Sequence, residues 1–578
     1  MDHTEKHGAN GPANHTVDTA RLRLALAQAD PTVGDLTGNS ALVLAWTARA
    51  AGEGAHVVAF PQLMLTGHPV GGLALQEPFL NACRRAVDDL AGRLAERGLG
   101  EIVVLAGCLD AGAADGPGPR AATAVLYRGA RVTGPADGDR PGAPPAVVRV
   151  GGVQVALAVG EDLEDPEDPE RGDGAFAEAR RAGAGLVVHG DAAPYELGPD
   201  DTRLALLARR ATEAGATVAS VNLVGGQDEL VFAGDSMVVR PDGALIARAP
   251  LFSERLMVLD LDLPAAAPQP AGGPAPGHAT LSDAVPEPAR PAPPPQIAAR
   301  GVDEAEVWQA LVLGLRDYAH KNGYHSVALG LSGGIDSAVA AAIACDALGP
   351  DGVVGVSMPG EDSSAASRDD ARDLALRTGL DFRVEPIQPM VDAFLANLAL
   401  GGPALELLPA RVRGVILATL ADQERRLLLT AGDRSALAIG DPILQGGPEA
   451  GFDPLKDVPR TLVRRLAQWR NEEAERRDEP PPIPRRATAG PPAGHEALDA
   501  ILAGYVDAGL GRDDLVAEGY DPGLVDRALR MVDSAEYRRR RIPPGTRISA
   551  RASAREHGLP ITNRFRHGRV VRPGTVPR

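Results

Sequence analysis

Residues 326–349 read SVALGLSGGIDSAVAAAIACDALG, and this stretch decides the fold of the second half of the chain. It places a short apolar run, a glycine turn and a helix of small residues in succession. A second apolar run, GVVGVSMPG (352–360), a helix-forming segment (367–379) and a third run, DFRVEPI (381–387), follow closely. This strand, turn, helix, strand succession predicts a right-handed βαβ unit in a parallel sheet.

The glycine turn, SGGIDS, has the chemistry of a phosphate site. Gly333 and Gly334 let the backbone approach an anion closely, and the helix N-terminus adds free N–H groups and the positive end of a dipole. The hydroxyls of Ser332 and Ser337 can donate to phosphate oxygens. Asp336 would repel a bare phosphate, so it implies a Mg²⁺ ion between the carboxylate and a nucleotide. The competing interpretation is an ordinary helix cap around a tight turn.

The first half of the chain, residues 21–263, shows the same alternation of strands and helices. Short β-branched runs such as AHVVAFPQL (55–63) and TVASVNLV (217–224) alternate with helical stretches such as 200–215. Runs of this kind are typical of buried strands. The pattern predicts a layered α/β domain.

The boundaries follow from abrupt changes in composition. Residues 264–300 are so rich in Pro and Ala that we expect an extended linker between the two domains. The second domain then covers 301–568. Residues 1–20 are polar and aperiodic, which predicts a disordered tail, and 569–578 form a second tail.

The composition of the 578 residues excludes several classes of protein. The net charge of −18 gives no global attraction for nucleic acid, although a local basic pocket for a small anion is compatible with it. The cysteines are Cys83, Cys108 and Cys345, an odd and sparse set that fits no disulfide framework. No run approaches the about 18 apolar residues of a membrane span, and no apolar signal core is present. We therefore expect a cytoplasmic protein without a membrane or nucleic-acid partner.

Longer segments resemble a known family. The turn itself is similar to the SGGxDS loop of ATP pyrophosphatases. LGLSGGIDSAVAAAIACDALGPDGVVGVSMP (329–359), GFDPLKDVPRTLVRRLAQWRNEEA (451–474) and LPITNRF (559–565) resemble the synthetase domain of glutamine-dependent NAD synthetases. LALAQADPTVGDLTGN (24–39) and GATVASVNLVGGQDELVFAGDSMVV (215–239) resemble the nitrilase-like glutaminase domain of the same enzymes.

The resemblance implies both a fold and a reaction. It implies a nitrilase-like α/β sandwich followed by a parallel-sheet synthetase domain with a pyrophosphate loop. The first domain of such enzymes hydrolyses glutamine and passes ammonia to the second. The second uses ATP and Mg²⁺ to adenylate the nicotinate carboxylate of deamido-NAD, and releases NAD, AMP and diphosphate. ATP and deamido-NAD are thus the expected ligands, and we expect a homo-oligomer.

The glutaminase chemistry of the family is missing from this sequence. That chemistry needs a Glu base, a Lys oxyanion donor and a Cys nucleophile. The resemblance places Gln62 where the base is expected and Gly160 where the nucleophile is expected, and no lysine lies between 7 and 320. Cys83 and Cys108 are better explained as small packed residues than as relocated nucleophiles. We predict that this domain does not hydrolyse glutamine.

The synthetase domain is altered only in part. By the resemblance, Arg411 and Lys456 belong to intact deamido-NAD-binding segments, whereas Arg555 stands where the family has Lys. In the segment TAGDRSA (430–436), Ala431 replaces a Thr that contacts ATP, and Ala436 replaces an acidic residue expected at a second Mg²⁺ or at the substrate. Leu407 replaces an Asn expected at deamido-NAD. ATP binding can therefore survive while turnover falls.

Three hypotheses remain open on sequence alone. The first is an ammonia-using NAD synthetase whose glutaminase half survives as a scaffold. The second is an inactive paralogue that binds nucleotide or regulates an active family member. The third is a ligase for another carboxylate. The run Arg538 to Arg541 also has two interpretations, a phosphate grip or, more simply, a solvated charged helix end.

Overall fold

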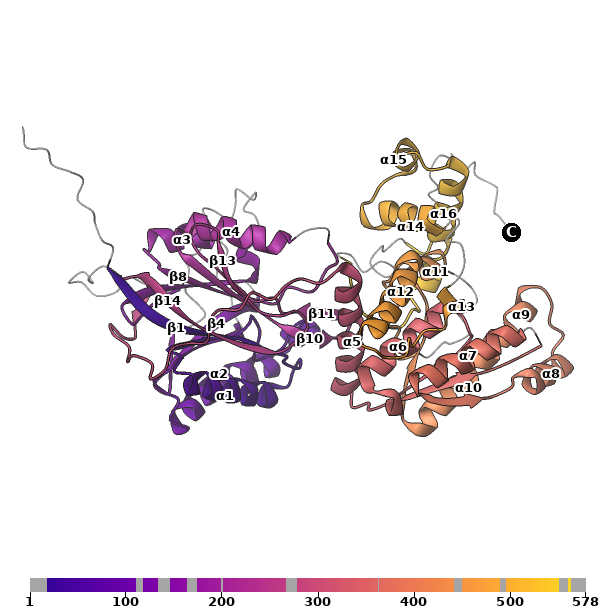
Figure 1. The fold of residues 1–578 in the computed structure, drawn as a ribbon, viewed down its shortest axis with the longest axis horizontal. Coiled ribbons are helices and arrows are strands. Elements are labelled where there is room, and N and C mark those ends of the chain that lie inside the picture. The colour runs from indigo at the N-terminus through magenta and orange to yellow at the C-terminus, as the bar shows by residue number, and fades with distance from the viewer. Residues whose placement is uncertain are drawn as a thin grey trace, which may run out of the picture.

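The computed structural model describes residues 18–110, 118–133, 146–163, 174–198, 201–266, 278–361, 363–440, 450–488, 495–549 and 560–562. Two α/β domains lie side by side along the long axis of the molecule (Figure 1). Within these residues, no helix combines the length and the apolar character needed to cross a membrane. The tail residues 1–17 and 569–578 lie outside the described part.

The first domain is a sandwich of two sheets with helices on both outer faces (Figure 1). Leu24 and Leu26 of one sheet and Val155 and Val188 of the other share one buried cluster, because alternate side chains of each strand point between the sheets. One sheet has the order β14 (Arg255–Pro264), β1 (Thr19–Gln28), β2 (Val57–Ala59), β3 (Val103–Asp110), β4 (Arg120–Tyr127), β5 (Ala130–Thr133). The other has the order β13 (Leu245–Arg248), β12 (Met237–Val239), β9 (Thr217–Asn222), β8 (Leu186–Asp191), β7 (Val153–Val159), β6 (Val147–Val150), β15 (His278–Thr280).

Helices cover the outer faces of the sandwich. Their apolar sides pack in two further clusters, one against each sheet. These helices are α1 (Leu36–Gly52) and α2 (Glu77–Glu96) on the first sheet, and α3 (Gly174–Arg181) and α4 (Thr202–Ala214) on the second. The predicted nitrilase-like α/β sandwich is confirmed.

The second domain is built on a parallel sheet with the order β18 (Asp381–Val384), β17 (Val353–Ser357), β16 (Val327–Gly330), β19 (Leu427–Leu429). Strands β16 and β17 pair in parallel and are joined by α6 (Ile335–Leu348), so the predicted βαβ unit is confirmed. One face of the sheet is covered by α5 (Asp303–Lys321), α6, α7 (Ala365–Thr378) and α12 (Arg460–Arg476). The other is covered by α8 (Gln388–Asn397) and α10 (Leu408–Glu424).

Shorter helices complete the second domain. The largest of them, α14 and α16, pack on α11 and form the lobe drawn in yellow at the top right of Figure 1. The set is α9 (Pro403–Glu406), α11 (Arg434–Ile439), α13 (Arg485–Thr488), α14 (His495–Leu502), α15 (Arg512–Ala517), α16 (Pro522–Ser534) and α17 (Glu536–Arg539).

Part of the Pro- and Ala-rich stretch lies along the first domain. Strand β15 pairs in parallel with β6, and the Ser282 hydroxyl accepts a hydrogen bond from the Gly151 N–H at 3.0 Å. Further on, the Arg248 N–H donates to the Gln296 carbonyl at 2.9 Å. The described half of this stretch, from residue 278, is therefore extended and attached to the sandwich.

The two domains share a core. The hairpin of β10 (Val224–Gln227) and β11 (Leu230–Ala233) projects from the first domain and packs against α5, as Figure 1 shows. Val224 and Val231 of this hairpin belong to the same buried apolar cluster as Val307 and Leu311 of α5. The boundary between the domains is thus packed like a protein interior.

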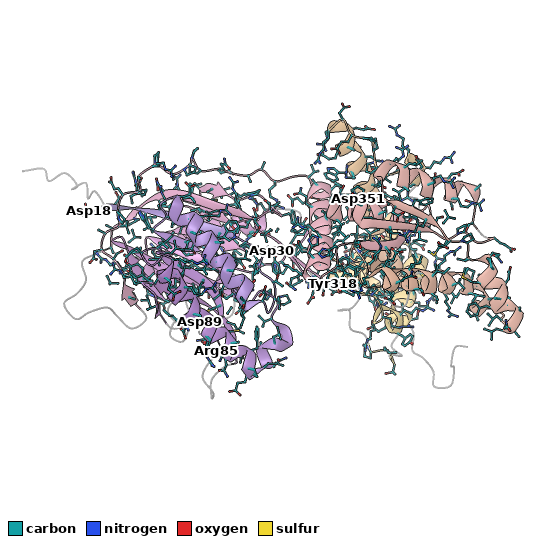
Figure 2. The ribbon with its side chains drawn as sticks, turned by 90° about the horizontal axis from the view of Figure 1, so that it is seen from below. Asp18, Asp30, Arg85, Asp89, Tyr318 and Asp351 are labelled. Carbon is teal, nitrogen blue, oxygen red and sulfur yellow. The ribbon has the colours of Figure 1, made fainter. Side chains whose placement is uncertain are left out.

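Ion pairs flank this shared core. Lys321 at the end of α5 donates to Asp30 at 2.6 Å and to the Gly226 carbonyl at 2.8 Å, and Asp317 accepts from the Gly226 N–H at 2.7 Å. Figure 2 labels Asp30 at this junction. Asp30 has a pKa raised to about 7, because burial and the neighbouring Asp317 outweigh the attraction of Lys321.

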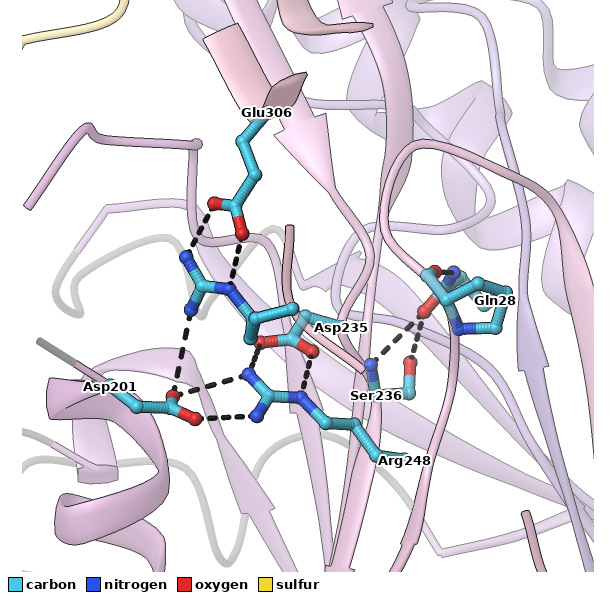
Figure 3. Close-up of polar contacts among 8 residues, drawn as sticks. Gln28, Asp201, Asp235, Ser236, Arg248 and Glu306 are labelled. Carbon is cyan, nitrogen blue, oxygen red and sulfur yellow. Dashed lines mark hydrogen bonds and ion pairs between the residues drawn. The ribbon is translucent and has the colours of Figure 1, made fainter. Parts of the chain in front are cut away.

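A second network fixes the start of α5 (Figure 3). Arg248 pairs with both Asp201 and Asp235, and Asp201 also faces Arg300 at 3.7 Å. Arg300 in turn pairs with Glu306 in the first turn of α5. The carboxylate of Asp201 therefore connects the sandwich to the second domain.

Candidate functional site

The glycine turn lies between the end of β16 and the start of α6. The Ser332 hydroxyl accepts from the Gly334 N–H at 3.1 Å and lies 3.0 Å from the Ser337 hydroxyl. Gly333 has φ +80°, and a Cβ at this position would lie 2.3 Å from the Ser367 carbonyl oxygen. Only glycine fits there, since that oxygen belongs to the backbone. The two hydroxyls and the first N–H groups of α6 thus gather at one point, as a phosphate requires.

Asp336 stands in the first turn of α6 with one carboxylate oxygen uncommitted. Its Oδ1 atom is buried and has no hydrogen-bond partner among the described residues. The pKa of Asp336 is raised to about 7, mainly by burial and then by the charges of Asp433 and Asp453. A buried, unpartnered carboxylate oxygen beside other carboxylates fits a bound cation.

The fit to Mg²⁺ depends on the nucleotide. In the described part of the chain, no group of three or more His, Cys, Asp or Glu side chains is arranged to hold a metal. Mg²⁺ usually binds one or two carboxylates and takes its remaining ligands from phosphates and water. Asp336 suits that kind of site, in which the ion arrives with the nucleotide.

A cavity of about 490 Å³ opens beside the turn. Its walls come from the ends of β16, β17 and β19 and from α10, which is where ligands bind in open parallel sheets. Ser332, Met358, Arg413 and Ala431 lie in these walls. The segment after α16 also lines the cavity, through Arg538, Arg541 and Ile542. Further lining residues are Leu329, Leu331, Ser357, Ser367, Arg368, Leu417, Leu429, Thr430, Gly432 and Asp453.

The loop after β19 shows what surrounds the two alanine replacements. Ala431 lines the cavity, and Ala436 is buried in the first turn of α11. Asp433 caps α11 by accepting from the Ala436 N–H at 2.9 Å, and its other oxygen pairs with Arg460 at 2.8 Å. Asp453 accepts from the Thr430 hydroxyl and the Gly432 N–H, both at 3.0 Å. The carboxylates of Asp433 and Asp453 therefore contact this loop, although position 436 has no carboxylate.

The residues predicted to bind deamido-NAD are not gathered in the structure. Lys456 is buried and forms an ion pair with Glu229 in the β10–β11 hairpin, away from the cavity walls. Arg411 is exposed on α10 outside the cavity, whereas its neighbour Arg413 lines it and donates to the Met358 carbonyl at 3.0 Å. Arg555 lies outside the described residues. Leu407, half-buried, immediately precedes α10.

In the first domain, the structure brings Gln62 and Gly160 together. A Cβ built on Gly160 would lie 2.5 Å from the Gln62 Oε1 atom and 3.2 Å from an Asp191 oxygen. The Gln62 N–H donates to the Asp191 carbonyl at 3.2 Å, which ties the loop after β2 to the end of β8. The positions at which the family resemblance expects the base and the nucleophile are thus neighbours. The side-chain amide of Gln62 occupies the space next to Gly160.

A buried ion pair occupies the same region. Asp191 pairs with Arg203 of α4, and His189 lies 3.9 Å from Asp191 and 3.0 Å from the Ser220 hydroxyl. Burial would raise the pKa of Asp191, but Arg203 and His189 outweigh it and lower that pKa. No local sequence motif joins the members of this group, which lie on separate strands and helices, so the sequence alone does not predict it.

The cysteines of the first domain are core residues, as predicted. Cys83 on α2 and Cys108 on β3 are both buried. Burial raises the pKa of the Cys83 thiol to about 11, which keeps it protonated at neutral pH. Neither cysteine occupies position 160, where the family resemblance expects the nucleophile.

The fold and the site define a class: a nitrilase-like domain joined to a ligase domain that binds nucleotide phosphates. Comparison with known proteins agrees with this class. Residues 173–271 match the carbon-nitrogen hydrolase family model, and residues 307–543 match the NAD synthase model.

Full-length relatives carry the comparison further. The chain is 33% identical to the glutamine-dependent NAD(+) synthetase of Aquifex aeolicus, over 94% of this chain and all of that protein. It is 35% identical to the one from Xylella fastidiosa over 94% and 99%. The structure of the Acinetobacter baumannii glutamine-dependent NAD+ synthetase, a complex with ADP, aligns with a TM-score of 0.69 and 29% identity over 94% of this chain and 99% of that one. The chain belongs to the glutamine-dependent NAD synthetase family.

Proposed function

We propose that this chain is an NAD synthetase that uses free ammonia. It would amidate the nicotinate carboxylate of deamido-NAD at the expense of ATP. The observation that carries the proposal is the pyrophosphate loop, with two hydroxyls, free N–H groups and an unpartnered Asp336 oxygen beside a cavity of about 490 Å³. Family membership over nearly the whole chain supports the same reaction.

The site residues have separate tasks in this reaction. Ser332, Ser337 and the N–H groups at the start of α6 would hold the phosphates that leave as diphosphate. Asp336 would hold Mg²⁺, which neutralises phosphate charge when bound. The substrate carboxylate attacks the α-phosphorus, and the bond to the diphosphate breaks. Ammonia then attacks the acyl carbon, the bond to AMP breaks, and a proton passes to solvent.

The choice of ammonia as the nitrogen source rests on the residues that the first domain has in place of the family's glutaminase residues. Gln62 has no basic oxygen at neutral pH, Gly160 has no nucleophilic atom, and the chain has no lysine between residues 7 and 320. Base, nucleophile and oxyanion donor are all needed for amide hydrolysis of this kind. The first domain would therefore act as a scaffold for the second.

The decisive experiment combines purified protein, ATP, Mg²⁺ and deamido-NAD with either glutamine or ammonium, and follows NAD and AMP together. We expect equal amounts of NAD and AMP with ammonium and neither with glutamine. The variant Asp336→Asn, which keeps the shape of the side chain but not its charge, should lose activity with ammonium. NAD formation that requires glutamine would contradict the choice of ammonia.

The second candidate is an inactive nucleotide-binding relative of the enzyme. The loss of a carboxylate at Ala436 and the engagement of Lys456 by Glu229 favour it. ATP binding by calorimetry, without NAD or AMP from any nitrogen source, would support this candidate. AMP formation with a different carboxylic acid would instead indicate a ligase of other specificity. Homo-oligomerisation, association with an active paralogue and a cytoplasmic location stay predictions.

A further inference from the structure

We propose that Arg538 and Arg541, which line the same cavity as Ser332 of the pyrophosphate loop, bind the phosphate chain of a nucleotide substrate. The proposal rests on the proposed function, because it assigns two further binding residues to the same cavity. Both side chains line the cavity that Ser332 borders. Both residues are exposed, which agrees with the predicted solvated helix end, but the same two side chains also border the cavity.

The segment that carries the two arginines is firmly held. Between them, Arg539 is 1% exposed and pairs with the buried Glu536 at 2.8 Å. Arg539 also donates to the Ala438 carbonyl of α11 at 2.8 Å. Arg538 in α17 and Arg541 just after it flank this anchored residue, and both line the cavity. A fixed backbone lowers the entropy cost of ordering long side chains around a ligand.

The charge of the cavity favours a polyanion. Among its titratable lining residues, Arg368, Arg413, Arg538 and Arg541 are cationic, and Asp453 is the acidic one. This concentration of positive charge lies in a chain with a net charge of −18. Such a local reversal of sign attracts phosphate groups and is costly to maintain without an anion.

The two guanidinium groups also have donors to spare. The Arg538 Nη1 atom donates to the Gly440 carbonyl at 2.6 Å, which aligns the side chain along the cavity wall. Within the described residues, no carboxylate forms an ion pair with Arg538 or Arg541. Arginine presents five N–H donors in a planar fork that matches phosphate oxygens. Two adjacent forks without a carboxylate partner suit a diphosphate or triphosphate chain.

Two nucleotides of the proposed reaction carry such a chain, and the test separates them. Binding of ATP with Mg²⁺, deamido-NAD and adenosine is measured by calorimetry for the unaltered protein, for Arg541→Gln and for the double variant Arg538→Gln/Arg541→Gln. Adenosine reports the rest of the cavity, since it has no phosphate. The matched control is Arg540→Gln, because Arg540 pairs with Glu536 and does not line the cavity.

We expect the double variant to lose about tenfold or more in affinity for one of the phosphate-bearing ligands, with a smaller loss for Arg541→Gln. Adenosine binding and the control should stay within twofold. A loss confined to ATP assigns the arginines to its triphosphate, and a loss confined to deamido-NAD assigns them to its diphosphate. The affinity for that ligand should also depend less on salt in the double variant.

Three results would overturn the inference. Unchanged affinity for both phosphate-bearing ligands would mean that the arginines are only solvated. An equal loss for adenosine would mean that they shape the cavity without contacting phosphate. If the unaltered protein binds neither ATP nor deamido-NAD, the proposed function fails and this inference fails with it. Thermal unfolding of each variant shows whether the Arg538 contact with Gly440 is needed for folding, and Arg541→Gln, which breaks no such contact, then decides.

Discussion

Gly160 and Gln62 show at the scale of single residues how closely two positions of the first domain approach each other. The amide oxygen of Gln62 lies where a side chain at position 160 would begin, 2.5 Å from the built Cβ. A contact that short cannot persist, so a larger residue at 160 would have to displace the Gln62 side chain. A side chain at position 160 would therefore require Gln62 to adopt another rotamer.

The first prediction follows from this crowding. The double variant Gln62→Glu/Gly160→Cys restores base and nucleophile but not the lysine, and buried Asp191 would stand 3.2 Å from the new Cβ. We expect no glutamate release above the unaltered protein, because a second carboxylate beside Asp191 favours the thiol over the thiolate and no oxyanion donor is present. A coupled glutamate assay measures this. Sustained release by the double variant would contradict the prediction.

The second prediction concerns Ala436. A glutamate introduced at this buried position would lie in the first turn of α11 near Asp433, whose charge already raises the pKa of Asp336. We expect Ala436→Glu to lower the free energy of unfolding by about 2 kcal/mol without ligand, because like charges are brought together in the interior.

Binding of Mg²⁺ and ATP should offset the loss of stability in Ala436→Glu. If the added carboxylate serves a cation, Mg²⁺ with ATP should raise the melting temperature of Ala436→Glu more than that of the unaltered protein. Ala436→Gln, which has the same size without the charge, is the control. Differential scanning fluorimetry with and without Mg²⁺ and ATP measures the shifts. Equal shifts in all three proteins would refute the role of charge at this position.

Among the elements, the β10–β11 hairpin and α5 form the closest link between the domains. Two of the three lysines of the chain, Lys321 and Lys456, are committed to it. Lys321 binds Asp30 and Gly226, while Lys456 binds Glu229 in the turn of the hairpin. The hairpin therefore connects the first domain to α5 and to the segment before α12.

The third prediction uses the raised pKa of Asp30, about 7 against an ordinary 3.8. The unfolded chain releases this proton near pH 4, whereas the folded protein keeps it until about pH 7. The folded state thus holds more protons in this window, and stability falls as pH rises through it, by at most about 1.4 kcal/mol per pH unit. Asp30→Asn should remove this contribution.

Urea unfolding at several pH values between 4.5 and 6.5 tests the prediction. The difference in slope between the unaltered protein and Asp30→Asn measures the contribution of the Asp30 carboxyl, including its interactions with Lys321 and Asp317. Asp262→Asn, which removes an exposed carboxylate from a surface pair with Arg21, is the control and should leave the slope unchanged. Parallel pH profiles for all three proteins would contradict the assignment to Asp30.

Sequence reasoning succeeded where structure is encoded locally. Alternating apolar runs predicted both α/β domains, and the SGGIDS sequence predicted the glycine turn between a strand and a helix, here β16 and α6. It could not place Lys456, because the partner of that lysine is Glu229, distant in the sequence. It also missed the ion pair of Asp191 with Arg203 and the cavity-lining position of Arg541. Those positions depend on how elements pack, and no short pattern records that.

At the scale of the whole molecule, the shared apolar cluster makes the domains one cooperative unit. Val224, Val231 and Ala233 of the first domain are buried against Val307 and Leu311 of the second. Unfolding either domain alone would expose this surface, at about 25 cal/mol per Å² of apolar area. Neither half is expected to unfold while the other stays intact.

The fourth prediction tests this cooperativity with the three tryptophans. Trp46 lies on α1 of the first domain, and Trp308 and Trp469 lie on α5 and α12 of the second. In the variant Trp46→Phe, tryptophan fluorescence reports the second domain, whereas far-ultraviolet circular dichroism reports both. We expect the two signals to share one midpoint in guanidinium chloride. Separate midpoints would show that the domains unfold independently.

The hairpin packed into the second domain also bears on the history of the gene. A deletion that removed the first domain would take away apolar side chains that cover α5, and the shortened product would expose that surface to the cell's chaperones and proteases. The packing of the hairpin against α5 thus gives a physical reason for the chain to keep its first domain, whatever that domain catalyses.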